Sequence, residues 1–357
     1  MVDILINASR IKYDILSDIF KDYTIDESYV NFYIDFHSII YRIYKNEFNS
    51  DIINDKNLIK CIVVSILNTV SHYRRFLSVK LKKNNRIFII FNDKIPDYQS
   101  SYIEYGRLYY DRYSKANKDY SSINAALEDS LSFVKELCSY FEELYFIDVS
   151  RIDEVNTITQ LMTKYDGCNI IYTKNELNYQ LVNSVNPTFI LYPDRDHSKL
   201  FNKSNIYDFV LTGKKFRPKH MTAEIFPIYL TLIGLSKRDV PSITIRGMVK
   251  IMKVIDLMLE NELISNSVSI QEFIYQLSKI VTVSESDKEL IYNRYMAISY
   301  KLGLVGLSSI KKQQIDSCII DLYDQNGLVK LNDSLGEAYI LNISDLNKNK
   351  RSGKVIW

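Results

Sequence analysis

Short apolar segments alternate with helix-like segments between residues 29 and 192, and this alternation constrains the fold more than any other feature of the chain. Five runs of β-branched, aromatic and aliphatic residues are typical of strands, at 29–35, 86–91, 144–148, 169–172 and 188–192. Segments with helical spacing of apolar residues separate most of them, at 56–83, 124–141, 153–165 and 177–183. Strands that alternate with helices form a mainly parallel sheet with helices on both faces. The sequence therefore predicts an α/β fold.

The pattern changes at about residue 216, after which almost every segment has helical spacing. We therefore predict an α/β domain over residues 1–215 and a helical C-terminal domain over 216–357. An amphipathic helix is expected within 1–28, and a small terminal hairpin at 327–343. With 46% hydrophobic residues, a chain of 357 residues can bury a core large enough for both domains.

Charge, cysteine content and hydropathy limit the functional classes. The chain has 45 Lys and Arg against 43 Asp and Glu, so its net charge of +2 excludes a uniformly basic nucleic-acid coat but allows a local basic face. Its four cysteines form no CxxC pair, which indicates reduced, buried thiols. Apolar runs are far shorter than the roughly 18–20 residues of a membrane helix. We expect a soluble cytoplasmic protein, and the abundance of Ile, Asn, Lys and Tyr favours an AT-rich viral or phage genome.

Polar side chains follow several of the predicted strands. Asp35 ends the first strand, Asn92 follows the second, and the stretches 148–153 and 173–176 follow the third and fourth. In open parallel sheets, ligands bind beyond the carboxyl ends of the strands. A ligand site is therefore expected at this edge of the sheet.

Five segments at or near this edge carry a family resemblance: YIDFHSIIYR (33–42), FNDKIP (91–96), RIDEVNTI (151–158), TKNELNYQLV (173–182) and GLSKRDVP (234–241). In order and spacing they resemble the motifs of the flap endonucleases, the branch of the PIN-like fold that includes the phage 5′-exonucleases and ribonucleases H. The resemblance implies a 5′-nuclease sheet, a helical arch at about 97–120, and a helix-hairpin-like DNA-binding region at 244–250, within the helical C-terminal part. It covers roughly residues 30–260.

The catalytic carboxylates of that family are mostly missing. Its members use two divalent cations, and two such ions near a phosphate need a dense carboxylate cluster. The resemblance places nine residues at carboxylate positions, of which only the two aspartates are acids: Asp35, Asn92, Asp153, Val155, Asn156, Asn175, Leu177, Leu235 and Arg238. Arg238 would put a permanent positive charge where a metal should bind. We therefore expect no cofactor, although Asp35 and Asp153 remain candidates for one weakly held cation.

A shift in register is the alternative. Asp93, Glu154, Glu176 and Asp239 each lie one or two residues from an emptied position. Restoring the whole cluster would need several independent shifts, and a side chain one step along a strand points to the other face. If such shifts occur, the protein is a divergent Mg- or Mn-dependent 5′ nuclease.

Basic and aromatic residues are interleaved in the expected arch, where cations suit phosphates and rings suit stacked bases. The candidate DNA-binding residues there are Arg107, Tyr109, Tyr110, Arg112, Lys115 and Lys118, and those of the hairpin-like region are Arg246, Gly247 and Lys250. The competing interpretation is that the tyrosines cover a core while the charges form a solvated face.

The function predicted from these observations is a catalytically inactive flap-endonuclease-like protein. It would act as a DNA-binding or scaffolding subunit of a viral or phage nucleic-acid complex, with DNA and a protein as partners. The alternatives are the divergent nuclease and a structural protein that has lost contact with DNA.

Overall fold

The computed structural model describes 27–36, 38, 69–70, 73–74, 77–78, 82–91, 131, 134–135, 138, 144–148, 154–193, 198–211, 221, 225–233, 253, 255–258, 260–261 and 268–299. The expected N-terminal helix, the arch at 97–120, the hairpin-like region at 244–250 and the terminal hairpin at 327–343 lie outside these residues or almost entirely so.

Six strands form one sheet in the order β3-β2-β1-β4-β5-β6. Their bounds are β1 Tyr29–Asp35, β2 Asn84–Phe91, β3 Leu144–Asp148, β4 Cys168–Tyr172, β5 Thr188–Pro193 and β6 Ser198–Phe201. All neighbouring pairs are parallel except β5 with β6. The predicted α/β class and its five strands are confirmed, with boundary changes of one or two residues. Strand β6 was not predicted, because its four residues contain no continuous apolar run.

The central strands are buried on both faces, which explains why they are mostly apolar. Asn31 of β1 and Asn169 of β4 are buried polar exceptions. In β1, the neighbouring residues Phe32 and Tyr33 are both fully buried and point to opposite faces. Phe32 packs on Tyr73, with ring centroids 4.3 Å apart, whereas Tyr33 stacks on Phe88 of β2 at 5.3 Å. Helix α8 (Glu154–Lys164) contacts β1 and β2 and was predicted at 153–165. It supplies Val155 and Ile158 to the core around Tyr33.

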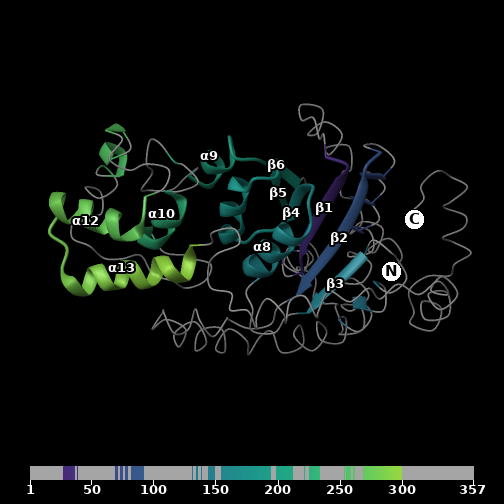
Figure 1. The fold of residues 1–357 in the computed structure, drawn as a ribbon, viewed down its shortest axis with the longest axis horizontal. Helices are drawn as coiled ribbons and strands as arrows, with labels where there is room; N and C mark the ends of the chain where they lie inside the picture. The colour runs from purple at the N-terminus through teal and green to yellow at the C-terminus, as the bar shows by residue number, and fades with distance from the viewer. Residues whose placement is uncertain are drawn as a thin grey trace, which may run out of the picture.

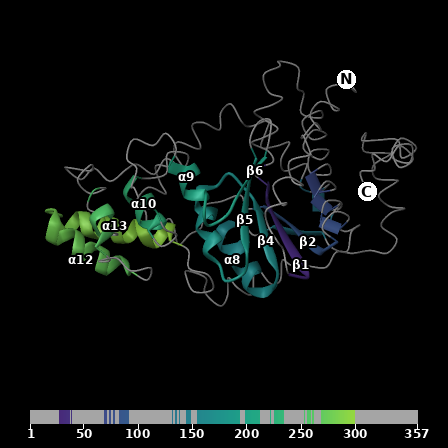
Figure 2. The same cartoon turned by 90° about the horizontal axis from the view of Figure 1, so that it is seen from above.

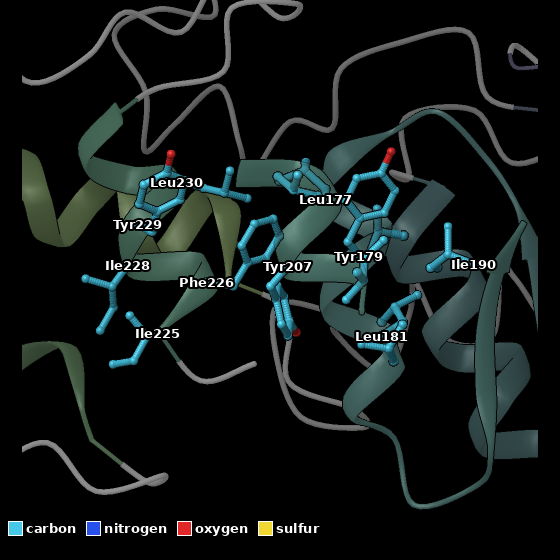
Figure 3. Close-up of a cluster of buried hydrophobic side chains, with 14 of the residues drawn as sticks. Leu177, Tyr179, Leu181, Ile190, Tyr207, Ile225, Phe226, Ile228, Tyr229 and Leu230 are labelled. Carbon is cyan, nitrogen blue, oxygen red and sulfur yellow. The ribbon is translucent and has the colours of Figure 1, made fainter. Parts of the chain in front are cut away.

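Three helices lie together at one end of the molecule, beyond β6 and α9 (Ile206–Leu211), as Figures 1 and 2 show in two directions. They are α10 (Phe226–Ile233), α12 (Ile270–Ile280) and α13 (Glu285–Ile298). One hydrophobic cluster continues from the sheet into this group, and Figure 3 shows part of it. Phe226 of α10 lies 5.1 Å from Tyr207 of α9 between ring centroids. The division into two domains near residue 215 stays a prediction.

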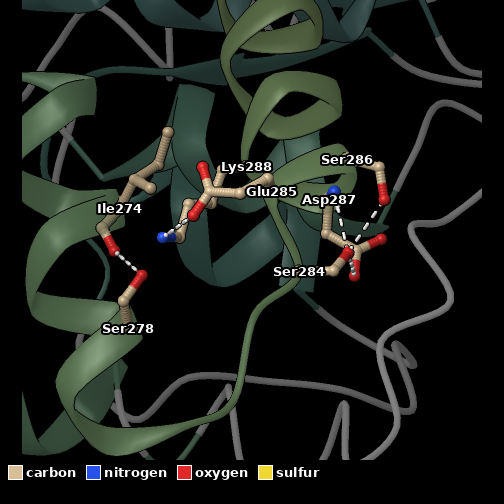
Figure 4. Close-up of polar contacts among 7 residues, drawn as sticks. All are labelled: Ile274, Ser278, Ser284, Glu285, Ser286, Asp287 and Lys288. Carbon is tan, nitrogen blue, oxygen red and sulfur yellow. Dashed lines mark hydrogen bonds and ion pairs between the residues drawn. The ribbon is translucent and has the colours of Figure 1, made fainter.

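Serine caps determine where α12 and α13 begin. Ser269 accepts a hydrogen bond from the Glu272 backbone N–H at 3.1 Å, and Ser284 accepts one from the Asp287 N–H at 3.1 Å. The Ser284 hydroxyl also donates to the Asp287 carboxylate at 2.6 Å (Figure 4). Each cap satisfies a backbone donor that would otherwise have no partner within the helix.

The expectation of buried, reduced cysteines is confirmed for Cys138 and Cys168, which are free and buried. Cys61 and Cys318 lie outside the described residues. Within the part of the chain that is described, no helix is long and apolar enough to span a membrane.

Candidate functional site

Asp35 lies at the carboxyl end of β1, in the middle of the sheet, and its side chain is only 3% exposed. The parallel register pairs Ile34 with Tyr172 of β4, so that Asp35 sits beside Thr173, the residue that follows β4. The hydroxyl groups of Ser38 and Thr173 donate to one Asp35 oxygen, Oδ2, at 2.5 Å and 3.1 Å. Asp35 therefore links the ends of two neighbouring strands.

The same hydroxyls also accept hydrogen bonds, which extends the network into the turn after β4. The Lys174 backbone N–H donates to Ser38 Oγ at 2.7 Å. Thr173 Oγ1 accepts from the Asn175 N–H and from the Asn178 side-chain amide, both at 2.9 Å. Serine and threonine hydroxyls can both donate and accept. The two hydroxyls therefore connect the carboxylate to the backbone and side chains of the turn at 173–178.

The structure brings only some of the predicted positions to this edge. Asn175 lies there and caps the 3-10 helix η3 (Glu176–Asn183) by accepting from the Leu177 N–H at 3.1 Å. Leu177 and Val155 are instead members of the hydrophobic core, and Asn156 is also buried. Figure 3 shows Leu177 between Tyr179 and Leu230. Four predicted positions lie outside the described residues: Asn92, Asp153, Leu235 and Arg238.

The burial of Leu177 changes how its motif is interpreted. A side chain that packs into the core stabilises the fold, so its apolar character is required there whatever the chemistry of the edge. Glu176, the acid one residue earlier, is partly exposed at the start of η3. The candidate DNA-binding residues of the arch and of the hairpin-like region are not among the described residues.

Sequence reasoning missed the hydroxyl partners of Asp35. Ser38 and Thr173 both lie within the motifs that carry the resemblance, at 33–42 and 173–182. The position of Ser38, three residues after Asp35 where the chain turns into a helix, could have indicated a hydroxyl that donates to the carboxylate. The buried Asn178 likewise lies within the motif at 173–182.

A two-metal centre needs several carboxylates in one place. In the described segments, no three His, Cys, Asp or Glu side chains are grouped so that they could hold a metal ion. Asp35 accepts from the hydroxyls of Ser38 and Thr173, and these hydroxyls in turn accept from the backbone N–H groups of Lys174 and Asn175. Asp35 is the single carboxylate among the described residues of this network, and the expected absence of a cofactor stays a prediction. The single cation predicted between Asp35 and Asp153 stays a prediction, because Asp153 lies outside those segments.

Solved structures of bacteriophage T5 proteins share this architecture. A T5 protein co-crystallised with metal ions has a TM-score of 0.52 and 10% identity, over 87% of this chain and 99% of that chain. A T5 5′-exonuclease with bound zinc has a TM-score of 0.51, with the same identity and coverage. This chain has the 5′-nuclease fold. A T5 flap endonuclease pseudo-enzyme in complex with product DNA and metal ions has a TM-score of 0.50 and 11% identity, over 87% of this chain and 98% of that chain.

The similarity confirms the α/β 5′-nuclease fold that the five motifs implied, and at this level of identity it concerns the fold alone. The arch and the hairpin-like region stay predictions. No protein-family model and no curated protein matches the sequence.

Two tyrosines near the edge predict how stability depends on alkaline pH. Burial raises the pKa of Tyr229 from its ordinary value of 10.0 to about 12, and the Glu176 carboxylate adds to the rise. Burial also raises the pKa of Tyr179 well above 10.0, with Glu176 the next cause. A raised pKa means that the folded state retains the phenol proton longer than the unfolded state does. The contribution of the neutral Tyr229 phenol to the free energy of unfolding is therefore fully present below pH 10. It is lost as the pH rises towards about 12.

Urea unfolding at a series of alkaline pH values, followed by circular dichroism, would measure this dependence. In Tyr229→Phe, the loss of unfolding free energy above pH 10 should be shallower than in the natural protein, because one of the titrating groups is gone. An equally steep loss in both proteins would contradict the assignment.

Proposed function

We propose that this chain is a catalytically inactive relative of the flap endonucleases that binds DNA as a subunit of a phage or viral nucleic-acid complex. The observation that carries the proposal is the engagement of Asp35 by the hydroxyls of Ser38 and Thr173. A two-metal nuclease needs this carboxylate to join others around cations. Here it accepts hydrogen bonds from two neutral hydroxyls, and these bonds tie β1 to the turn after β4.

Binding of DNA is proposed from the fold. A flap endonuclease pseudo-enzyme of the same fold is known in complex with product DNA, although that complex contains metal ions. Loss of carboxylates also lowers the negative charge that would repel a phosphate backbone in the absence of metal. The predicted DNA contacts in the arch, Arg107, Arg112, Lys115 and Lys118, belong to this proposal.

An active nuclease with a divergent ligand set is the second candidate. The partly exposed Glu176 favours this candidate, because it could supply the carboxylate that the buried Leu177, one residue later, does not. This candidate requires Asp35 and Asp153 as metal ligands, assisted by Glu154, Glu176 or Asp239, with Mg or Mn as the cofactor.

Metal-free DNA binding is the expected result that separates the first candidate from a purely structural protein. Fluorescence anisotropy with a labelled 5′-flap DNA should give the same affinity in EDTA as in Mg²⁺. The affinity should fall at least about tenfold between about 50 and about 200 mM salt, because phosphate contacts release counterions. A variant with Arg107, Arg112, Lys115 and Lys118 changed to Gln should bind more weakly and depend less on salt.

Absence of binding at low salt would contradict the proposal and favour a protein that has lost contact with DNA. Binding that requires Mg²⁺ would favour the second candidate. A single-stranded oligonucleotide and a blunt duplex, measured beside the flap, would show which part of the DNA is recognised.

A further inference from the structure

Two lysines lie over aromatic rings at the carboxyl edge of the sheet, on the side of β4 away from Asp35. Lys174 Nζ lies 5.3 Å from the centroid of the Tyr192 ring, and Lys199 Nζ lies 5.7 Å from that of Phe209. The two rings contact each other, with centroids 5.1 Å apart. We call these four residues the lysine–aromatic patch. They come from four different elements: the turn after β4, β5, β6 and α9.

The backbone beneath the patch is fixed on both sides. The Thr173 N–H donates to the Leu191 carbonyl at 3.2 Å, and the Lys174 N–H donates to Ser38. Antiparallel pairing places Tyr192 directly opposite Lys199, so both side chains lie on the same face of the sheet. Tyr192 and Phe209 are partly buried against the core. The patch therefore presents ammonium groups from a rigid base.

The geometry of each pair favours a cation held in place. Both ammonium groups lie within the roughly 6 Å at which a ring face attracts a cation. Holding each lysine over a ring reduces the side-chain freedom that would be lost on binding an anion. The acids close by in the sequence are Glu176 in η3, Asp208 in α9, and Asp194 and Asp196 between β5 and β6. Glu176 and Asp208 are at least partly exposed, and Asp194 and Asp196 lie outside the described residues.

We propose that the lysine–aromatic patch binds the phosphate groups of a DNA strand without a metal ion, with Lys174 and Lys199 each contacting one phosphate. The inference rests on the proposed function and names the residues that replace metal ions as the positive charge at this edge. Lysine suits the role because its compact ammonium carries three donors and binds phosphate as a point charge.

The test is the salt dependence of binding to a labelled 5′-flap DNA in EDTA. Each phosphate contact contributes about 0.9 to the slope of log affinity against log salt, so Lys174→Gln and Lys199→Gln should each make the slope about 0.9 less negative. At about 50 mM salt each should weaken binding about tenfold, and the double variant should lose both contributions. Lys174→Arg and Lys199→Arg should keep the natural slope, because arginine retains the charge.

Lys279→Gln is the matched control. Lys279 Nζ also lies over a ring, 3.9 Å from the Tyr275 centroid, but on α12 at the far end of the molecule (Figure 1). Its slope should equal that of the natural protein. Thermal unfolding of every variant would exclude loss of folding as the cause.

Three results would overturn the inference. If the natural protein binds and the double variant has the same slope, the patch makes no phosphate contact while the proposed function stands. If Lys279→Gln changes the slope as much as the patch variants, the salt dependence reflects the net charge of the protein and not contacts at the patch. If the natural protein does not bind the DNA at all, the proposed function fails as well. The measurement on the natural protein distinguishes this result from the first, without any variant.

Discussion

Replacing Gly167 with alanine is expected to lower the free energy of unfolding by about 3–5 kcal/mol, a large part of the stability of an ordinary domain. Gly167 connects α8 to β4 with φ at +134°, a conformation that residues with a Cβ rarely adopt. An added Cβ would lie 2.5 Å from the Tyr29 carbonyl oxygen and 3.1 Å from its carbon. Both atoms are backbone at the start of β1, so no flexible side chain can move aside.

The same turn is held from the other side, which leaves no room for adjustment. The buried Asn31 of β1 donates to the carbonyls of Tyr165 and Asp166 at 3.2 Å and 3.3 Å. Arg86 donates to the Asn31 side-chain oxygen at 3.1 Å and lies 4.0 Å from the centre of the Tyr29 ring. Moving the turn to relieve the clash would break these contacts between β1, β2 and the entrance to β4.

Asp166→Ala is the matched control for Gly167→Ala. The Asp166 side chain is exposed, and its backbone carbonyl accepts the hydrogen bonds from Asn31 and Arg86. Its change should alter the free energy of unfolding by no more than about 0.5 kcal/mol. Urea denaturation of both variants would decide the matter, and an equal, small effect in both would contradict the account of the turn.

Replacing Asp35 with alanine is expected to lower the free energy of unfolding by about 2–4 kcal/mol, because two buried hydroxyl groups would lose their acceptor. Asp35→Asn keeps an oxygen at the same place and should cost only about 1 kcal/mol. Both measurements are made in EDTA, so that bound metal plays no part.

The sign of the Asp35→Asn effect separates the two candidate functions. In a cluster of metal-binding carboxylates, neutralising one member removes like-charge repulsion and stabilises the metal-free protein. In the network described here the acid accepts from the neutral donors of Ser38 and Thr173, so neutralising it weakens two hydrogen bonds. A rise in the melting temperature of Asp35→Asn in EDTA would therefore contradict the role assigned to Asp35.

The strands of the sheet could be predicted because their residues are mostly β-branched, aromatic or aliphatic. β1 and β3 have the predicted bounds, and β2, β4 and β5 differ by one or two residues. β6 was missed because SKLF carries a lysine and a serine in four residues, and its pairing with β5 is a tertiary contact. Local patterns contain little information on such short edge strands.

The location of the candidate site could be predicted from the sequence, but not which side chains face it. The sequence predicted that Asp35 and residues 173–176 lie at the carboxyl edge, since the ends of parallel strands meet there. It could not show that Leu177 faces the core while Glu176 is partly exposed. Both residues lie in η3, and which side of a short 3-10 helix is buried depends on packing. Lys174 and Lys199 were not singled out, since their aromatic partners lie 18 residues or 10 residues away in the sequence.

The most direct test of the central claim is a cleavage assay on an end-labelled 5′-flap DNA with Mg²⁺ or Mn²⁺, resolved on a denaturing gel. Asp35→Asn, purified in parallel, controls for contaminating nuclease and preserves the hydrogen-bond acceptor. We expect that neither protein cuts the DNA at concentrations where the natural protein binds it fully. Metal-dependent cutting by the natural protein that disappears in Asp35→Asn would contradict the account and establish an active nuclease with a divergent ligand set.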